Sequence, residues 1–379
     1  MPLTQREREI VELLRAEPLL DAAALAERVG STKAAVSVHL SNLTRKGVIV
    51  GRGYVLRPDK GSVVVIGGTN MDIKAQSRSA LALRTSNPGA TTSTPGGVGR
   101  NIAENLARLG SPTQLVSPVG RDAFGDQVLE ATRVAGVGLD HVIRGDAPTG
   151  TYLAVLDADG ELVVAVSTMG ATDGLTVDQL TGVRDLVANA DLLVVDGNVP
   201  AAPTTWLLDT AAAADVPVVI DPVSVAKARP LAAILSPSRP VLAVTPNLDE
   251  LAAIVGEDVP DTKGGIARAA ARLHERGVAH VWVRRGRRGS ILSNRTHADT
   301  RPTVSLLPAP PTTLVDVTGA GDAMTAAFVH AHLRGDSPLD AVRFGQSAAA
   351  LTVACPQTVR PDLTARLVDA ELRRATQEK

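Results

Sequence analysis

The sequence predicts an α/β protein built on a doubly wound, mostly parallel sheet with a small β lid, preceded by a small helical domain. From residue 62 onward, short continuous aliphatic runs recur, each followed by a helical segment. Such strands are typical of parallel sheets covered by helices on both faces. One stretch instead alternates around Asp159-Gly160, which indicates a hairpin. Three short helical segments come before residue 50. We therefore expect two domains, at residues 1–58 and 62–379.

Length and composition limit the classes of protein to consider. The 379 residues allow two or three domains, and the aromatic content of 2% means that the core is aliphatic. A single cysteine, Cys355, excludes an intrachain disulfide and fits a reducing compartment. No apolar run approaches the roughly 20 residues of a membrane helix, and the charged start lacks the apolar core of a signal peptide. We expect a cytoplasmic protein without a membrane partner.

The helical domain comes first in the chain. Thr4 is placed to cap a helix over 5–15, a second helix covers 22–29, and a third runs from about Ser31 to Lys46 and stops at Gly47. Residues 48–56 then alternate around Gly51-Arg52-Gly53 as a short hairpin. Three helices with a tight turn before the third, followed by a hairpin, predict a winged helix-turn-helix.

The third helix resembles the recognition helix of bacterial winged regulators. Residues 1–60 carry a net charge of +3 and the remainder −4, which favours DNA as a partner. The alternative is a helical module used for dimerisation. The residues expected to be exposed and to reach base edges are Thr32, Lys33, Ser37, His39 and Asn42, and those expected to reach phosphates are Arg45, Lys46 and Arg52.

In the α/β domain, polar residues follow the predicted strands. Ligands of open parallel sheets bind at the carboxyl ends of the strands, which points to Asn70, Asp72, Asp196, Asp221, Asn247 and Gly286. The hairpin strands 151–156 and 162–166, together with 91–94, are predicted to form a separate small sheet that covers the pocket. The strands predicted for the main sheet are 63–66, 115–119, 192–195, 218–220, 241–244 and 281–283.

The stretch Asp316 to Asp322 is the strongest candidate for chemistry. Gly319 and Gly321 lie in a turn that opens into a helix, and the free amides of a helix start attract phosphate. A carboxylate beside that anion site would repel phosphate, so Asp322 makes sense as a base that takes a proton from an attacking hydroxyl. This arrangement indicates a small-molecule kinase. The alternative is a glycine turn with an acidic helix start.

Two further turns carry candidate ligand groups. Gly96 and Gly97 precede a helix that contains Asn101, whose amide can bind sugar hydroxyls. Asp72 follows the first strand, and a carboxylate suits a vicinal diol that donates two hydrogen bonds. The alternative for the first turn is an ordinary connection between a strand and a helix.

Asn247 to Glu250 allows two interpretations. Asn247 as cap and Glu250 three residues later form a capping-box pattern. The functional interpretation places Glu250 near hydrated Mg²⁺ on nucleotide phosphates. Both can hold. Residues 285–290 form a glycine-containing basic turn after a strand, which is either a nucleotide loop or a simple turn.

Together, these motifs resemble the two signatures of the ribokinase-like (phosphofructokinase B) carbohydrate kinases. Gly96–Asn101 and Asp316–Asp322 lie about 220 residues apart and in the family's order, with an Asn-x-x-Glu motif at 247–250. The resemblance implies ATP and Mg²⁺ as cofactors and Asp322 as the base. It also implies an anion hole of Gly319, Ala320 and Gly321 amides, a sugar site of Asn70, Asp72, Gly96, Gly97 and Asn101, and a nucleotide loop at Gly286 and Gly289. Asp316 and Thr318 fall where some members bind a monovalent cation such as K⁺.

Finer matches at 86–89, 96–106, 221–224 and 317–324 resemble the pseudouridine kinases, some of which carry an amino-terminal winged helix. This implies phosphorylation of the 5′-hydroxyl of pseudouridine. Thr168, where we expect Asp, and the bulky, charged Lys74 depart from that pattern. They leave another nucleoside, or a sugar such as ribose, open as the substrate. A homodimer through the lid is expected from the family.

The rival hypothesis is a transcription regulator that uses the kinase fold to sense a ligand. In such a protein we expect the base, the anion hole or the Asn-x-x-Glu motif to be lost. Asp322, Gly319, Gly321, Asn247 and Glu250 are all present, which favours an active kinase. A kinase whose substrate modulates DNA binding would combine the two.

Overall fold

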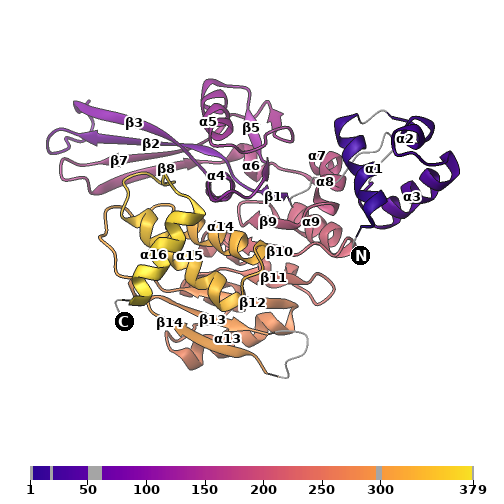
Figure 1. The fold of residues 1–379 in the computed structure, drawn as a ribbon. Helices are drawn as coiled ribbons and strands as arrows, with labels where there is room; N and C mark the ends of the chain where they lie inside the picture. The colour runs from indigo at the N-terminus through magenta and orange to yellow at the C-terminus, as the bar shows by residue number, and fades with distance from the viewer. Residues whose placement is uncertain (1–2, 18–19, 50–61, 296–300, 378–379) are drawn as a thin grey trace. The chain divides into compact units, whose positions relative to one another are not determined.

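The computed structural model describes residues 3–17, 20–49, 62–295 and 301–377. Contacts divide the chain into two compact units, Met1–Lys60 and Gly61–Lys379 (Figure 1). Within the described ranges, no helix is long and apolar enough to cross a membrane.

The amino-terminal unit contains three helices around one apolar core. They are α1 (Gln5–Ala16), α2 (Ala22–Arg28) and α3 (Lys33–Arg45). As expected, Thr4 caps α1, because its hydroxyl accepts from the Glu7 amide and the Glu7 carboxylate accepts from the Thr4 amide. The buried Glu7 carboxylate also pairs with Lys46 at 2.7 Å, which ties the start of α1 to the end of α3. The core side chains include Ile10, Leu14, Leu25, Val36, Leu40 and Leu43.

The expected DNA-contacting residues differ in exposure. Lys33 and Ser37 are exposed, and the exposed Thr32 caps α3 by accepting from the Ala35 amide at 3.2 Å. The expectation that His39 and Asn42 are exposed is wrong. Both are half-buried, because they lie on the flank of α3 next to its core-facing stripe.

The outward side of α3 carries an internal hydrogen bond and an exposed valine. Asn42 Oδ1 accepts from Arg45 Nη2 at 2.8 Å, and Val38, 60% exposed, lies on the outward side of α3. Arg52 and residues 50–56 of the predicted wing lie outside the described residues.

The second unit is built on an eight-stranded sheet with the order β14-β13-β12-β11-β10-β9-β1-β4 (Figure 1). Strands β4, β1, β9, β10, β11 and β12 pair in parallel, as the continuous aliphatic runs predict. At the other edge, β13 and β14 pair antiparallel, and this part of the sheet was not predicted. The strands are β1 (Val63–Ile66), β4 (Thr113–Val116), β9 (Leu192–Asp196), β10 (Val218–Asp221), β11 (Val241–Val244), β12 (Val278–Arg284), β13 (Ser290–Asn294) and β14 (Thr303–Leu307).

Helices cover both faces of this sheet, as predicted for a doubly wound fold. Alternate residues of β1 belong to the two apolar cores, with Val63 and Val65 on one side and Val64 and Ile66 on the other. The first face carries α4 (Val98–Leu109), α14 (Ala320–Leu333), α15 (Pro338–Val353) and α16 (Ala365–Gln377). The second carries α7 (Val177–Leu180), α8 (Arg184–Ala188), α9 (Ala201–Ala213), α11 (Leu231–Ile234), α12 (Leu248–Val255) and α13 (Lys263–Glu275).

A separate four-stranded sheet forms the predicted lid, in the order β3-β2-β7-β8 (Figure 1). Its strands are β2 (Asn70–Ser77), β3 (Gly89–Gly96), β7 (Gly150–Leu156) and β8 (Leu162–Thr168). Strand β2 was not predicted, and Asn70 and Asp72 lie on it rather than in a turn. The predicted strand 115–119 is also divided, into β4 and a short β5 (Pro118–Gly120) that pairs with β6 (Ile143–Gly145).

Candidate active site

The turn before α14 is shaped by glycine. Gly319 is the N-cap of the helix with φ of +79°, a conformation that side chains rarely adopt. A Cβ on Gly319 would also overlap the Thr358 carbonyl, and a Cβ on Gly321 would lie 2.6 Å from Arg284 Nη1. The Ala320 amide donates to the Val317 carbonyl at 3.3 Å. The turn therefore keeps its backbone bare at the start of α14, where the helix dipole favours an anion.

Asp322, in the first turn of α14, contacts the other glycine motif directly. Its Oδ2 accepts from Asn101 Nδ2 at 2.8 Å. Asn101 lies in the first turn of α4 and is held in place because Arg100 Nη1 donates to its Oδ1 at 3.0 Å. The structure thus brings together two motifs that are 221 residues apart in the chain.

The electrostatic surroundings of Asp322 suit a proton acceptor. Burial and, to a lesser extent, the nearby Asp221 carboxylate raise the pKa of Asp322 to about 7, although Asn101 and Arg284 oppose the shift. A general base works best when its pKa is close to the working pH. Asp322 can therefore accept a proton near neutral pH and release it readily.

Asp196, at the end of β9, joins two glycine loops, Gly67-Gly68 after β1 and Gly96–Gly99 before α4. Its Oδ2 accepts from the Gly68 amide at 2.9 Å and from the Gly99 amide at 2.8 Å. The loops touch backbone to backbone, because a Cβ on Gly99 would lie 2.7 Å from Gly67 Cα. The sequence analysis noted Asp196 only as a polar residue at a strand end. Its bracing role depends on a contact between distant segments.

The predicted sugar-binding residues converge at the start of the lid. Asn70 Nδ2 donates to Asp72 Oδ1 at 2.6 Å, and burial raises the pKa of Asp72. Gly96 pairs with Asn70 across the lid strands, and a Cβ on it would lie 2.6 Å from the Asp72 carboxyl carbon. Gly97 has φ of +98° and opens α4. These residues belong to β2, β3 and the turn that leads into α4, the helix that carries Asn101.

Asn247 and Glu250 form the capping box that the sequence analysis gave as one interpretation. The Glu250 carboxylate accepts from the Asn247 amide and from Asn247 Nδ2, both at 2.9 Å. Each carboxylate oxygen has a further lone pair. Arg284 Nη2 lies 3.5 Å from Oε2, so Oε1 is the atom that keeps acceptor capacity for a metal-bound water. Within the described ranges, no group of three or more His, Cys, Asp or Glu side chains could hold a metal ion.

The predicted nucleotide loop follows β12. Gly286 has φ of +56°, and Gly289 has φ of +79° with no room for a Cβ beside the Ala309 amide at 2.7 Å. Arg285 and Arg288 both pair with Asp261, which fixes the loop. Both positions favour glycine because φ is positive at each of them.

Arg284 is a site residue that the sequence analysis missed. Its Nη1 donates to Asp221 Oδ2 at 3.1 Å, and its Nη2 lies 3.5 Å from Glu250 Oε2. It also lies against Gly321, and the two buried carboxylates raise its pKa despite burial. An arginine run at the end of a strand gave no sign that Arg284 turns inward while Arg288 pairs at the surface.

Asp316 and Thr318 lie on the turn before the anion site. Asp316 Oδ1 accepts from the Thr318 amide at 2.8 Å and from its hydroxyl at 2.6 Å. Asp316 Oδ2 lies 3.5 Å from Lys74 Nζ of the lid. Lys74, one of the departures noted above, is therefore directed to Asp316. Thr168, the other departure, is exposed at the end of β8.

Comparison with known proteins is consistent with this geometry. The model of the pfkB family carbohydrate kinases matches residues 60–365, and a winged helix-turn-helix DNA-binding model matches residues 3–50. An Escherichia coli K12 protein named "Uncharacterized sugar kinase YeiI" is 33% identical over 96% of this chain and 97% of its own length.

Two further relatives carry names that specify a substrate. The pseudouridine kinase of Escherichia coli K12 is 34% identical over 81% of this chain and 95% of its own length. The structure of Arabidopsis thaliana ribokinase complexed with ribose and ATP superimposes with a TM-score of 0.70 at 26% identity, covering 83% of this chain and 99% of that one.

Proposed function

The chain belongs to the pfkB family of carbohydrate kinases, and on this premise we propose that it transfers a phosphoryl group from ATP to the 5′-hydroxyl of pseudouridine. Family membership makes it a kinase of a sugar or nucleoside with an alcohol group as acceptor. The finer assignment is supported by the pseudouridine kinase relative and by the residues of the site.

The hydrogen bond between Asn101 and Asp322 at the start of α14 carries the mechanism. Asp322 accepts the hydroxyl proton while the hydroxyl oxygen forms its bond to the γ-phosphorus. The bond from that phosphorus to the bridging oxygen breaks, and ADP leaves. The amides of Gly319, Ala320 and Gly321 stabilise the charge on the transferring group, for which the Ala320 amide turns away from its 3.3 Å contact with the Val317 carbonyl.

The remaining residues bind and orient the reactants. Asn70, Asp72, Gly96, Gly97 and Asn101 form the proposed ribose site, in which the Asp72 carboxylate accepts from the 2′- and 3′-hydroxyls. On the other side, Gly286 and Gly289 line the nucleotide phosphates. Asn247 and Glu250 would hold Mg²⁺ through water, and the metal would supply charge neutralisation at the phosphates. Asp316 and Thr318 are the proposed K⁺ ligands.

The test of the mechanism is Asp322→Asn. We expect turnover to fall by roughly 10²- to 10⁴-fold, as for removal of a general base, while ATP affinity measured by calorimetry stays within twofold. A variant that keeps near-full turnover would remove Asp322 from the mechanism.

The test of the substrate is ATP consumption against pseudouridine, uridine, inosine, adenosine, ribose and fructose 6-phosphate. We expect the highest kcat/KM with pseudouridine. Preference for ribose or another nucleoside would move the assignment to that substrate and leave the chemistry unchanged. No turnover with any of them, despite ATP binding, would favour the sensor hypothesis.

The amino-terminal unit supports a second role, because its match to a winged helix-turn-helix model accompanies an exposed face with Lys33 and Ser37. We propose that it binds DNA and that the nucleoside modulates this binding. A gel shift on the DNA upstream of the protein's own reading frame, with and without pseudouridine, tests it. Lack of binding even at low salt would contradict the proposal.

We also propose a homodimer formed through the lid. Strand β8 is exposed along its whole length, and Leu162, Val163, Val164 and Val166 are each 50% to 57% exposed. Apolar side chains in a row of this kind mark an interaction surface.

A further inference from the structure

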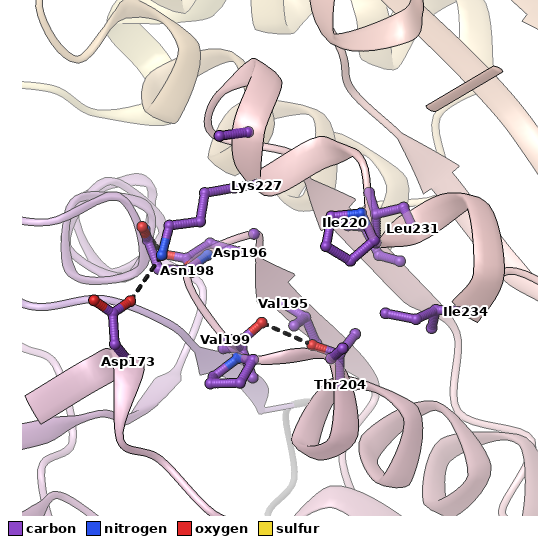
Figure 2. A pocket seen from close by; sticks show the side chains of 15 residues that line it. Asp173, Val195, Asp196, Asn198, Val199, Thr204, Ile220, Lys227, Leu231 and Ile234 are labelled. Atoms are coloured by element: carbon purple, nitrogen blue, oxygen red, sulfur yellow. Dashed lines mark hydrogen bonds and ion pairs between the residues drawn. The ribbon is translucent and has the colours of Figure 1, made fainter. Parts of the chain in front are cut away.

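A cavity of about 230 Å³ opens at the carboxyl ends of β9 and β10 (Figure 2). Its aliphatic wall comes from Val195, Ile220, Leu231 and Ile234, which belong to the core on the second face of the sheet. Asn101 and Asp322 project from α4 and α14 on the first face. The cavity is therefore separate from the phosphate-transfer site, although both lie at the same edge of the sheet.

The rim of the cavity is polar and places opposite charges side by side. Lys227 of α10 (Val225–Ala228) donates to Asp173 of α6 (Gly170–Asp173) at 2.8 Å (Figure 2). Both side chains remain partly exposed, at 36% and 55%. The rim therefore offers a fixed hydrogen-bond donor and a fixed acceptor above an apolar wall. Few ligand sites need more than this to fix the orientation of a flat ring.

The cavity reaches toward the proposed ribose site through Asn198. Asn198 Nδ2 donates to Asp196 Oδ2 at 3.2 Å, and Asp196 holds the Gly68 amide. A Cβ on Gly68 would lie 3.1 Å from Asn198 Nδ2, and Asn70 follows two residues later. Asp173 is similarly close to the lid, because its short helix begins two residues after β8 ends. Both rim elements thus border the diol-binding end of the site.

The turn that carries Lys227 is strained. Val223 has φ of +68°, which is rare for a β-branched residue and is maintained only where the surroundings enforce it. Its amide donates to Asp221 Oδ1 at 3.0 Å, and a Cβ on Gly197 would lie 2.9 Å from the Pro222 carbonyl carbon. The close approach of the two strand ends fixes the start of α10, and with it the direction of Lys227.

We propose that this cavity receives the base of the nucleoside and selects a ring with a cyclic imide edge. The inference rests on the proposed function. In a nucleoside with its 5′-hydroxyl at Asp322 and its diol at Asp72, the base on C1′ points away from the 5′-hydroxyl, past the diol and toward Asn198. There, Lys227 donates to a ring carbonyl, Asp173 accepts from a ring N–H, and the ring face covers the aliphatic wall.

The test uses two variants of the full chain, each with a matched control. Lys227→Met removes the donor and keeps the length of the side chain, and Lys263→Met, at an exposed lysine in the first turn of α13, is the control. Ala201→Trp places an indole over the mouth, with Ala202→Trp as the control. Ala201 lines the cavity and Ala202 does not, and both are exposed at the start of α9. The readout is the ratio of kcat/KM for pseudouridine to kcat/KM for ribose. Dissociation constants from calorimetry replace it where ribose turnover is too slow.

We expect the ratio to fall about tenfold or more in Lys227→Met, as for loss of a hydrogen bond to a charged group. We expect a fall of about the same size in Ala201→Trp, because the indole blocks the mouth, and a ratio within twofold of the unmodified protein in both controls. An unchanged ratio in either test variant would overturn the inference, and so would equal losses for pseudouridine and ribose. Failure of the proposed function is distinguishable, because the unmodified protein would then phosphorylate a sugar but no nucleoside.

Discussion

The pKa of Asp322 gives the sharpest prediction. With a value of about 7, the base is about one tenth ionised at pH 6 and about nine tenths ionised at pH 8. Because only the ionised carboxylate accepts the proton, kcat/KM should rise about tenfold between these pH values, with a slope of one below pH 6. The assay is ATP consumption under saturating Mg-ATP, with the substrate that the protein prefers.

The neighbours of Asp322 allow the sign of this shift to be tested. The Asp221 carboxylate raises the pKa of Asp322 by repulsion, so Asp221→Asn should move the acidic limb to lower pH. Asp126→Asn is the control, because Asp126 also lies in the first turn of a helix but is exposed. A limb near pH 4 in the unmodified protein, or an upward shift in Asp221→Asn, would refute the reasoning.

Three other substitutions have defined outcomes. Gly99→Ala forces a Cβ within 2.7 Å of Gly67 Cα, and both glycine loops must move apart, so we expect kcat/KM to fall at least tenfold and the melting temperature to drop. Arg284→Met leaves the buried Asp221 and Glu250 carboxylates without their cation, which should cost about 3–5 kcal/mol in the free energy of unfolding measured by denaturant titration. Val164→Lys places a charge in the exposed apolar row of β8 and should convert a dimer to a monomer in light scattering.

Each of these has a matched control. Gly182→Ala meets no atom within 4 Å, and Arg272→Met breaks a pair that is half-exposed on both sides. Val134→Lys changes a valine that is 79% exposed at the end of helix α5 (Ala123–Val134), away from β8. All three should leave unchanged the activity, the free energy of unfolding and the mass of the assembly in light scattering. A test variant that behaves like its control contradicts the contact from which it was predicted.

Residue patterns predicted the parallel part of the sheet, because continuous aliphatic runs specify buried strands. The family resemblance, and not the strand pattern, implied that Asn101 and Asp322 belong to one site. The helix cap at Thr4 and the capping box at Asn247 were predictable from the residue pattern, since both depend on residues only three positions apart.

Long-range packing decided what could not be predicted. Strand β2 has no clear alternation of apolar residues, and its burial does not alternate along the strand either. Its pairing with β7, about 80 residues later, is therefore absent from local patterns. Arg284 turns inward only because Asp221 and Glu250 are there to receive it. His39 and Asn42 lie on α3 beside the buried Leu40 and Leu43, and their exposure depends on how the neighbouring helices pack, which the helical spacing alone does not give.

The bracing of both glycine loops by Asp196 has a consequence for biosynthesis. Gly68 and Gly99 are made 128 and 97 residues before the carboxylate that holds their amides. A nascent chain that ends before β9 has both loops but no acceptor between them. Contacts of such high sequence separation form late and slow folding. The two loops are therefore held together only once β9 has entered the sheet, and substrate can stabilise only chains that have passed this point.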